Sequence, residues 1–282
     1  MLVKMIKKPV RRLRRMRNDG ILERLTPEID AFLISYPKSG RTWLRYLLSC
    51  YFAHAGTVDF EPDLRTTFRV LPNFDRDRER GLPAFVGKRP GLPLIAVSHR
   101  SFNARFFGKR PLIFLVRDPR DVCVSAYFHE TRHKHRFDGD ITAFIEDKER
   151  GIPAIIDYHN GWATQVARGP SLVISYEEMS RDTTATVTRI LEFLGLPVHE
   201  EALKSAIEKA KFDQMKKDEK KTGIPGHDYD RTDDDSLRVR KGKVGGYEEY
   251  LSAADADRVL ELCREGLTPE GRSLMAHAGV EL

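Results

Sequence analysis

Cysteine is scarce in this chain, and the three that occur, Cys50, Cys123 and Cys263, lie far apart in the sequence. None belongs to a C-x-x-C pair, and none has a histidine at a spacing typical of metal ligands. This pattern argues against a disulfide framework and against a zinc site, and it favours a reducing compartment.

Long apolar runs are also missing. No stretch approaches the roughly 20 apolar residues that a membrane-spanning helix needs. Basic residues interrupt the apolar ones in the N-terminal segment MLVKMIKKPVRRLRRMR, so no uninterrupted signal-peptide core is present there. A hydrophobic content of 40% and a charged content of 32% are typical of a soluble globular protein. We therefore expect a cytoplasmic protein with a basic tail, residues 1–25, and a single domain, residues 26–282.

Most of the chain lacks an excess of positive charge. The formal net charge is +6, but residues 1–17 contain eight Lys or Arg and no acidic residue. Subtracting those eight charges from the total of +6 leaves −2 for the remaining chain. A general nucleic-acid-binding surface is therefore not expected.

The basic tail itself has two interpretations. One is an amphipathic helix on anionic lipid, in weak peripheral contact with the inner membrane surface. Its apolar stripe would comprise Leu2, Ile6, Val10, Leu13 and Met16. The other is a solvated terminus with little fixed structure, which we favour because Pro9 interrupts a single helix.

The pattern of apolar residues predicts an α/β fold. Continuously apolar runs predict buried strands at residues 31–36, 94–98, 112–116 and 171–175. Helical patterns lie between them or follow, at residues 42–54, 119–131, 140–149, 157–168 and 183–194. Strands alternating with helices indicate a central parallel sheet with helices on both faces, and ligands bind such sheets beyond the carboxyl ends of the strands. The polar stretches 62–93 and 213–246 are expected to be long loops, and loops of this length are often lids.

A short loop with a lysine follows the first strand, in the segment YPKSGRTW at residues 36–43. Gly40 allows tight backbone geometry and Lys38 adds a positive charge, so the loop and the start of the next helix could hold an anion. The loop is not a Walker A motif, because Lys38 precedes Gly40 and no Mg²⁺-binding aspartate is recognisable after another strand. Taken alone, an ordinary loop with a surface lysine explains the segment about as well.

Other polar residues follow the later strands. Arg117 ends the third strand, and Ser125 lies on the following helix, where a guanidinium and a hydroxyl could together hold a phosphate. Asp118 and Asp121 are suited to cap that helix. The basic turn RKG at residues 240–242 contains a glycine that permits close backbone approach, although it could equally be a basic surface loop.

Together these segments resemble the PAPS-dependent sulfotransferases of the cytosolic type. The resemblance rests on YPKSGRTW (36–43), RDPRDVCVSAYFH (117–129), SYEEM (175–179), FDQMKK (212–217) and RKGKVGG (240–246). The segments occur in the order of that family and span roughly residues 31–250. The resemblance implies a P-loop-like sulfotransferase fold and an enzyme that moves the sulfuryl group of PAPS to an acceptor hydroxyl, or less often an amine. By the same resemblance, PAP would be the product and no metal would be required.

The resemblance also implies roles for individual residues. The loop around the 5′-phosphosulfate would comprise Lys38, Ser39, Gly40, Arg41 and Thr42. The 3′-phosphate would be held by Arg117, Ser125, Arg240, Lys241 and Gly242. The adenine contacts would be Trp43, Tyr176 and Phe212.

The histidine of LIAVSHR, His99, matches the general base of the family. An imidazole with an ordinary pKa near ~6.5 can take the proton of an attacking hydroxyl. Lys38 would neutralise charge on the leaving oxygen, and Ser125 completes the expected catalytic set. Without the family framework, His99 would more simply be a histidine that satisfies backbone groups at a strand end. The histidines at 129, 133 and 135 are interleaved with Arg and Lys, which favours a solvated basic face or acceptor contacts over a metal site.

The chain departs from the family at several positions. Val97 stands where many members have a lysine, and Arg41 replaces a small or hydroxyl residue and could partly supply that charge. Gly246-Tyr247 stands where Asp-Trp is frequent, and the usual dimer signature is not recognisable, so dimerisation by that mode is not expected. The segments expected to form the acceptor site lack the apolar pattern of a phenol or steroid pocket, which favours a polar acceptor such as a glycan or a decorated natural product. These segments are residues 56–93, 130–160 and 222–239.

Two other functions compete with this interpretation. A small-molecule kinase on the same sheet would need Walker A and Mg²⁺ ligands. A peripheral membrane scaffold with a vestigial nucleotide site would depend on the cationic tail instead.

Overall fold

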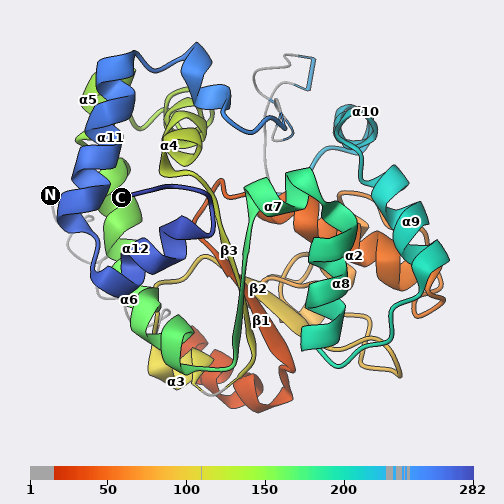
Figure 1. Ribbon diagram of the computed structural model, residues 1–282. Coiled ribbons are helices and arrows are strands. Elements are labelled where there is room, and N and C mark those ends of the chain that lie inside the picture. Colours follow the sequence, from red (N-terminus) through yellow and green to blue (C-terminus); the bar gives the residue numbers. More distant parts are fainter. Residues whose placement is uncertain (1–15, 109, 227–230, 233–236, 238, 240–241) are drawn as a thin grey trace, which may run out of the picture.

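The computed structural model describes residues 16–108, 110–226, 231–232, 237, 239 and 242–282 (Figure 1). Its centre is a four-stranded sheet in the order β2-β1-β3-β4, and every strand pair is parallel. The strands are β1 Ala31–Ser35, β2 Ile95–Ser98, β3 Leu112–Val116 and β4 Ser171–Ser175. The predicted α/β fold with a central parallel sheet is confirmed.

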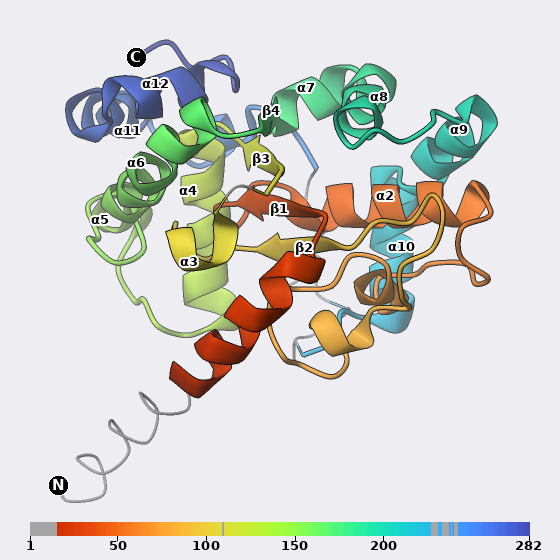
Figure 2. The same cartoon turned by 90° about the horizontal axis from the view of Figure 1, so that it is seen from below.

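Helices cover both faces of this sheet (Figures 1 and 2). One layer contains α4 Pro119–Phe128, α5 Ile141–Ile145, α6 Ile152–Arg168, α11 Ala253–Gly266 and α12 Pro269–Ala276. The other contains α2 Arg41–His54, α7 Tyr176–Arg181, α8 Thr183–Phe193, α9 Glu200–Lys209 and α10 Phe212–Thr222. The short helix α3 Ala104–Phe107 adds Phe106 and Phe107 to the first layer.

Successive residues of the central strands belong to opposite cores. Phe32 and Phe114 pack with the layer that contains α4, whereas Leu33 and Ile113 pack with the layer that contains α2. A strand that is buried on both faces needs apolar residues at every position. This is why these strands are continuous apolar runs in the sequence rather than alternating ones.

Several helix boundaries differ from the prediction. Helix α6 begins at Ile152 rather than at 157, since a proline in its first turn lacks an N–H group that the helix would leave unbonded anyway. Helix α4 ends at Phe128, and the chain continues into a π-helical turn, His129–His133. Single 3₁₀ turns occur at Thr26–Glu28, Thr66–Arg69, Leu82–Ala84 and Gly246–Glu249.

The expectation that residues 213–246 are entirely loop is wrong at their start, where α10 forms. Few of its side chains are apolar, but Met215 is buried against the α2 layer. The Tyr46 hydroxyl donates to Asp218 at 2.7 Å, and the buried carboxylate of Glu219 accepts the N–H of Val239 at 2.8 Å. These long-range polar contacts, rather than an apolar stripe, hold the helix in place.

The described part of the N-terminal segment is helical over residues 16–25. Leu22 is buried in the core, and Asp19 forms an ion pair with Arg100 at 2.8 Å. Residues 1–15, which contain most of the expected apolar stripe, lie outside the described residues, so the tail boundary and its membrane contact stay predictions. Among the described residues, no helix is both long and apolar enough to cross a membrane. All three cysteines are free and buried.

Candidate active site

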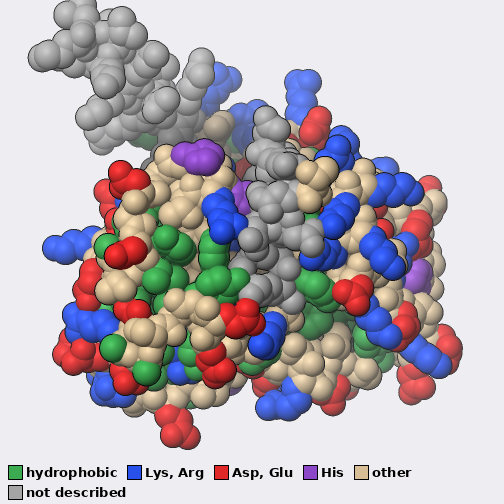
Figure 3. Space-filling model, turned by 90° about the horizontal axis from the view of Figure 1, so that it is seen from above, with side chains coloured by type: hydrophobic (Ala, Val, Ile, Leu, Met, Phe, Trp, Pro, Cys, Tyr) green, Lys and Arg blue, Asp and Glu red, His purple; other side chains and the backbone are tan. Residues whose placement is uncertain are grey.

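A cavity of 710 Å³ lies at the carboxyl ends of the strands. It is lined by most residues that the sequence singled out, namely Lys38, Gly40, Arg41, Thr42, Trp43, His99, Arg117, Ser125, Tyr176, Phe212 and Gly242. Ser39 is buried within the same loop, whereas Arg240 and Lys241 lie outside the described residues. Viewed onto this end of the sheet, Lys and Arg side chains flank the middle of the face (Figure 3).

The loop between β1 and α2 has a strained, anion-binding geometry. Lys38 has φ 75°, a left-handed conformation that costs an L-residue roughly 1–2 kcal/mol. Gly40 is the N-cap of α2 with φ 96°, and no side chain caps the helix there. A Cβ atom on Gly40 would collide with the ring of Tyr176. The start of α2 therefore meets the cavity with uncapped amide groups, which favour an anionic ligand.

Replacement of Gly40 tests this geometry. Gly40→Ala combines an unfavourable φ with the collision against Tyr176, so we expect a loss of about 1–3 kcal/mol in unfolding free energy. PAP binding should become too weak to detect by calorimetry at micromolar protein. The matched control is Gly56→Ala, because Gly56 follows the same helix with φ 75° and has no atom near the added Cβ. The proposed geometry is wrong if both variants bind PAP like the wild-type protein.

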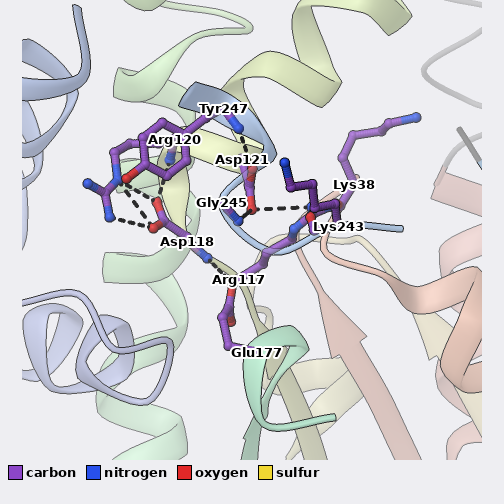
Figure 4. A network of polar contacts seen from close by, with 9 residues as sticks. All are labelled: Lys38, Arg117, Asp118, Arg120, Asp121, Glu177, Lys243, Gly245 and Tyr247. Carbon is purple, nitrogen blue, oxygen red and sulfur yellow. Dashed lines mark hydrogen bonds and ion pairs between the residues drawn. The ribbon is translucent and has the colours of Figure 1, made fainter. Parts of the chain in front are cut away.

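Arg117 joins the two loops that border the cavity (Figure 4). Its Nη1 donates to the Lys38 carbonyl at 3.2 Å, and its Nη2 donates to the Lys243 carbonyl at 3.1 Å. The guanidinium also lies over the ring of Tyr176, 4.2 Å from the ring centroid. Its Nε is buried and has no hydrogen-bond partner among the described residues. A cation with a donor left over at this position is suited to bind phosphate.

Asp121 holds the loop of residues 242–246, here called the returning loop, against the guanidinium of Arg117. Its carboxylate lies 3.4 Å from Arg117 Nη2 and accepts the N–H groups of Gly245 at 3.0 Å and Tyr247 at 2.9 Å. Burial raises the pKa of Asp121, and the neighbouring Arg117 opposes that rise. Asp121 was expected only as a helix cap, and no sequence signal indicates a contact with residues so distant in the chain.

Asp118 does cap α4, as expected. It accepts the backbone N–H of Arg120 at 2.8 Å, and its carboxylate forms an ion pair with the Arg120 guanidinium at 2.6 Å. The backbone N–H of Asp118 donates to Glu177 at 3.0 Å. Burial raises the pKa of Glu177 to about 7. These contacts join the ends of β3 and β4 beneath Arg117.

Aromatic rings form another wall of the cavity. The rings of Trp43 and Tyr176 are 5.5 Å apart at an angle of 66°. Gly242 has φ 62°, and a Cβ atom there would collide with the ring of Phe212. The backbone of the returning loop therefore packs directly on Phe212, at the start of α10. Such a set of rings is suited to contact a planar base.

The geometry determines which nitrogen of His99 carries the proton. His99 Nδ1 lies 2.6 Å from the backbone carbonyl of Ser35, and a carbonyl oxygen can only accept. The proton is therefore on Nδ1, and Nε2 keeps the lone pair. Burial, followed by the charge of Arg41 and then those of Arg45 and Lys38, lowers the pKa of His99 well below its ordinary value. The imidazole is neutral at neutral pH and can accept a proton at Nε2.

Comparisons with known proteins show the family to which this chain belongs. The family model described as "Sulfotransferase domain" matches residues 28–271. The chain belongs to the sulfotransferase family. It is 30% identical to rat Sulfotransferase 2B1, over 84% of this chain and 70% of that protein. It is 27% identical to Sulfotransferase 2A1 of Macaca fascicularis, over 93% of this chain and 91% of that protein.

Solved structures share the fold of this sulfotransferase. Mouse sulfotransferase SULT7A1 complexed with PAP has a TM-score of 0.63 and 23% identity, over 89% of this chain and 90% of that one. Retinol dehydratase in complex with androsterone and PAP has a TM-score of 0.59 and 21% identity, over 85% of this chain and 81% of that one. At these identities the likeness shows the fold alone.

The sulfotransferase cavity also contains residues that sequence reasoning missed. These residues are Arg45, Asn73 and Arg80. Val97, which stands where many family members have a lysine, does not line the cavity and is buried in the core. Arg45 is four residues after Arg41 on α2, a helical spacing that could have indicated it. Asn73 and Arg80 lie in the segment 56–93, which was expected at the acceptor site, but no periodicity there singles out individual residues.

The lining of the whole cavity bears on the expected acceptor site in two ways. Apolar side chains line the cavity as well as polar ones, namely Leu47, Phe68, Ile207, Met215, Ile224 and Val239. No residue of 130–160, all of which the structure describes, lines this cavity, so the place of this segment in the acceptor site stays a prediction. Of the three clustered histidines only His129 lines the cavity.

Proposed function

We propose that this sulfotransferase transfers the sulfuryl group of PAPS to a hydroxyl group of an acceptor, with His99 as the general base. The observation that carries the proposal is the 2.6 Å contact between His99 Nδ1 and the Ser35 carbonyl, which leaves Nε2 as the proton acceptor. The same cavity holds Lys38 and Arg117, two cations on separate loops. A base and two cationic subsites together suit sulfuryl transfer from a nucleotide with two phosphate groups.

The residues present fit the nucleotide. The loop of residues 38–42 and the uncapped start of α2 would hold the phosphosulfate. Arg117 and Ser125 would hold the 3′-phosphate, with residues 240–242 joining them. The buried Ser39 hydroxyl and Arg117 Nε have no hydrogen-bond partner among the described residues, as expected of donors kept for a ligand. The rings of Trp43, Tyr176 and Phe212 would contact the adenine.

In the reaction, His99 Nε2 takes the proton of the acceptor hydroxyl as the oxygen attacks sulfur in line. When bound, PAPS supplies the sulfuryl group, and the oxygen of its 5′-phosphate keeps the electron pair of the broken bond. Lys38 neutralises the charge that gathers on that oxygen, a preorganised electrostatic role. The Ser35 carbonyl holds the imidazole in the required tautomer and stabilises the imidazolium that forms.

The low pKa of His99 favours a reaction in which the nucleotide binds before the acceptor is deprotonated. The positive charges of Arg41, Arg45 and Lys38 disfavour protonation of the His99 imidazole. An anionic nucleotide held by Lys38 and Arg41 reduces that repulsion, so His99 becomes a stronger base once the nucleotide is bound. We propose a polar acceptor such as a glycan or natural product, a choice supported by Asn73 and the arginines that line the cavity.

Titration with PAP and with ATP·Mg tests the proposal. PAP at 100 times its Kd should raise the unfolding free energy by about 2.7 kcal/mol in a thermal-shift experiment, whereas ATP·Mg should not. Stabilisation by ATP·Mg alone would instead support a small-molecule kinase. No stabilisation by either nucleotide would support the membrane scaffold with a vestigial site.

A further inference from the structure

Arg45 is a buried cation whose charge the protein leaves largely uncompensated. Its side chain lies in α2, is only 4% exposed and lines the cavity. Nη2 donates to the Asn73 side chain at 2.6 Å, and the guanidinium lies 4.3 Å from the ring centroid of Phe68. Among the described residues, Nε has no hydrogen-bond partner and no carboxylate forms a salt bridge with Arg45. A single neutral amide is a weak counterpart for a guanidinium.

The charges around Arg45 add to this imbalance. Burial, followed by Arg41, lowers the pKa of Arg45; Asp75 raises it, and Arg80 lowers it further. An arginine does not lose its proton in proteins, so the buried charge persists. Removing an ion from water without a partner costs several kcal/mol, and an anionic ligand in the cavity would offset that cost.

Arg80 adds a second cation from a different segment. Its Nη1 donates to the Pro225 carbonyl at 3.2 Å, and its Nη2 lies 3.4 Å from Asp77. It lines the same cavity, beside the backbone of Gly226, where a Cβ atom would collide with the guanidinium. Arg80 is therefore held in a defined position, close enough to Arg45 for its charge to act on it.

These two arginines are separate from the residues expected to hold the nucleotide. Lys38 and the amides of α2 lie at the start of that helix, whereas Arg45 is one turn further along it. Arg45 donates a hydrogen bond to the side chain of Asn73. Asn73 in turn pairs with Val97 of β2, the strand that ends just before His99. The charge of Arg45 also acts on His99. Arg45 thus lies on the side of the cavity where the hydroxyl must meet the base, and Arg80 is close to Arg45.

We infer that the acceptor carries a carboxylate in addition to its reacting hydroxyl, and that Arg45 and Arg80 bind this carboxylate. The inference rests on the proposed function. A guanidinium binds a planar carboxylate with two parallel hydrogen bonds. A neutral acceptor would lack the negative charge that makes these hydrogen bonds strong. The apolar neighbours Phe68 and Ile224 would contact the body of such an acceptor.

The test compares two phenols that differ in one group, 4-hydroxyphenylacetate and 4-hydroxyphenylacetamide. Sulfation by PAPS gives kcat/KM for each, and calorimetry on the PAP-saturated protein gives the binding constants. The wild-type enzyme should prefer the acid by at least about tenfold, and Arg45→Met should reduce this preference by roughly 10- to 100-fold, the effect of one charge-assisted hydrogen bond. Arg80→Met should reduce it less, because that side chain is 25% exposed.

Arg69→Met is the matched control. Arg69 also lies over a phenylalanine ring, that of Phe60 at 4.4 Å, but it does not line the cavity. Its substitution should leave the preference for the acid unchanged. If Arg45→Met fails to fold, Arg45→Gln, which also removes the charge, and Arg80→Met provide the same comparison.

Two results would overturn the inference while leaving the proposed function intact. In one, wild-type enzyme binds PAP and treats the acid and the amide alike in both assays. In the other, Arg45→Met lowers PAP affinity but keeps the preference for the acid, which would place Arg45 at the nucleotide. Failure of the wild-type protein to bind PAP would instead refute the proposed function, and this inference with it.

Discussion

His99→Ala should lower kcat by roughly 10²–10⁴-fold, the usual contribution of a positioned general base. The loss follows because the acceptor hydroxyl no longer has a proton acceptor at the carboxyl end of β2. PAP affinity should stay close to that of the wild type, since the Nδ1 contact of His99 is with Ser35 and not with the proposed nucleotide residues. Steady-state kinetics and PAP calorimetry on the same preparation measure both quantities.

His159→Asn is the matched control for this substitution. His159 Nδ1 also contacts a backbone carbonyl, that of Ile155 at 2.7 Å, and burial lowers its pKa to about 4. It does not line the cavity, so its substitution should alter stability but not kcat. The assignment of His99 would be refuted by a His99→Ala enzyme that turns over normally, or by one that loses PAP binding with unchanged turnover.

Arg117→Met should weaken PAP binding by roughly 100-fold, the loss of one or two charge-assisted hydrogen bonds of about 1.5–3 kcal/mol each. The substitution also releases the carbonyls of Lys38 and Lys243, so both bordering loops lose their common contact. It leaves Asp121, whose side chain is 3% exposed, without its cation, at a cost of about 3–5 kcal/mol in unfolding free energy. Calorimetry with PAP and urea unfolding measure the two effects.

Arg120→Met separates the binding effect from the stability effect. Arg120 is likewise paired with an aspartate, Asp118 at 2.6 Å, and lies over a tyrosine, Tyr247 at 4.3 Å. It does not line the cavity, so its removal should destabilise the protein without changing PAP affinity. Equal PAP affinities for the Arg117 and Arg120 variants would contradict the role proposed for Arg117.

The sheet was predictable because its signal is local. The runs at 112–116 and 171–175 agree with β3 and β4, and the first two runs agree with β1 and β2 to within a residue. The same holds for the loop of residues 38–42, whose glycine, lysine and following helix are adjacent in the chain. Hydrophobic periodicity, by contrast, did not predict α10, because polar contacts with Tyr46 and Val239 stabilise it rather than an apolar stripe.

By itself the sequence determined the parallel sheet, the order of the strand-end motifs and the resemblance to sulfotransferases, since each depends on residues within one segment. Only the tertiary structure decided the tautomer of His99, the contact of Asp121 with Gly245 and the position of Arg45 beside Asn73. The paired residues are separated by 64, 124 and 28 positions respectively. Hydrogen bonds need donor and acceptor within about 3 Å. Whether segments so distant in the chain come that close depends on how the helices pack on the sheet, and no local pattern encodes it.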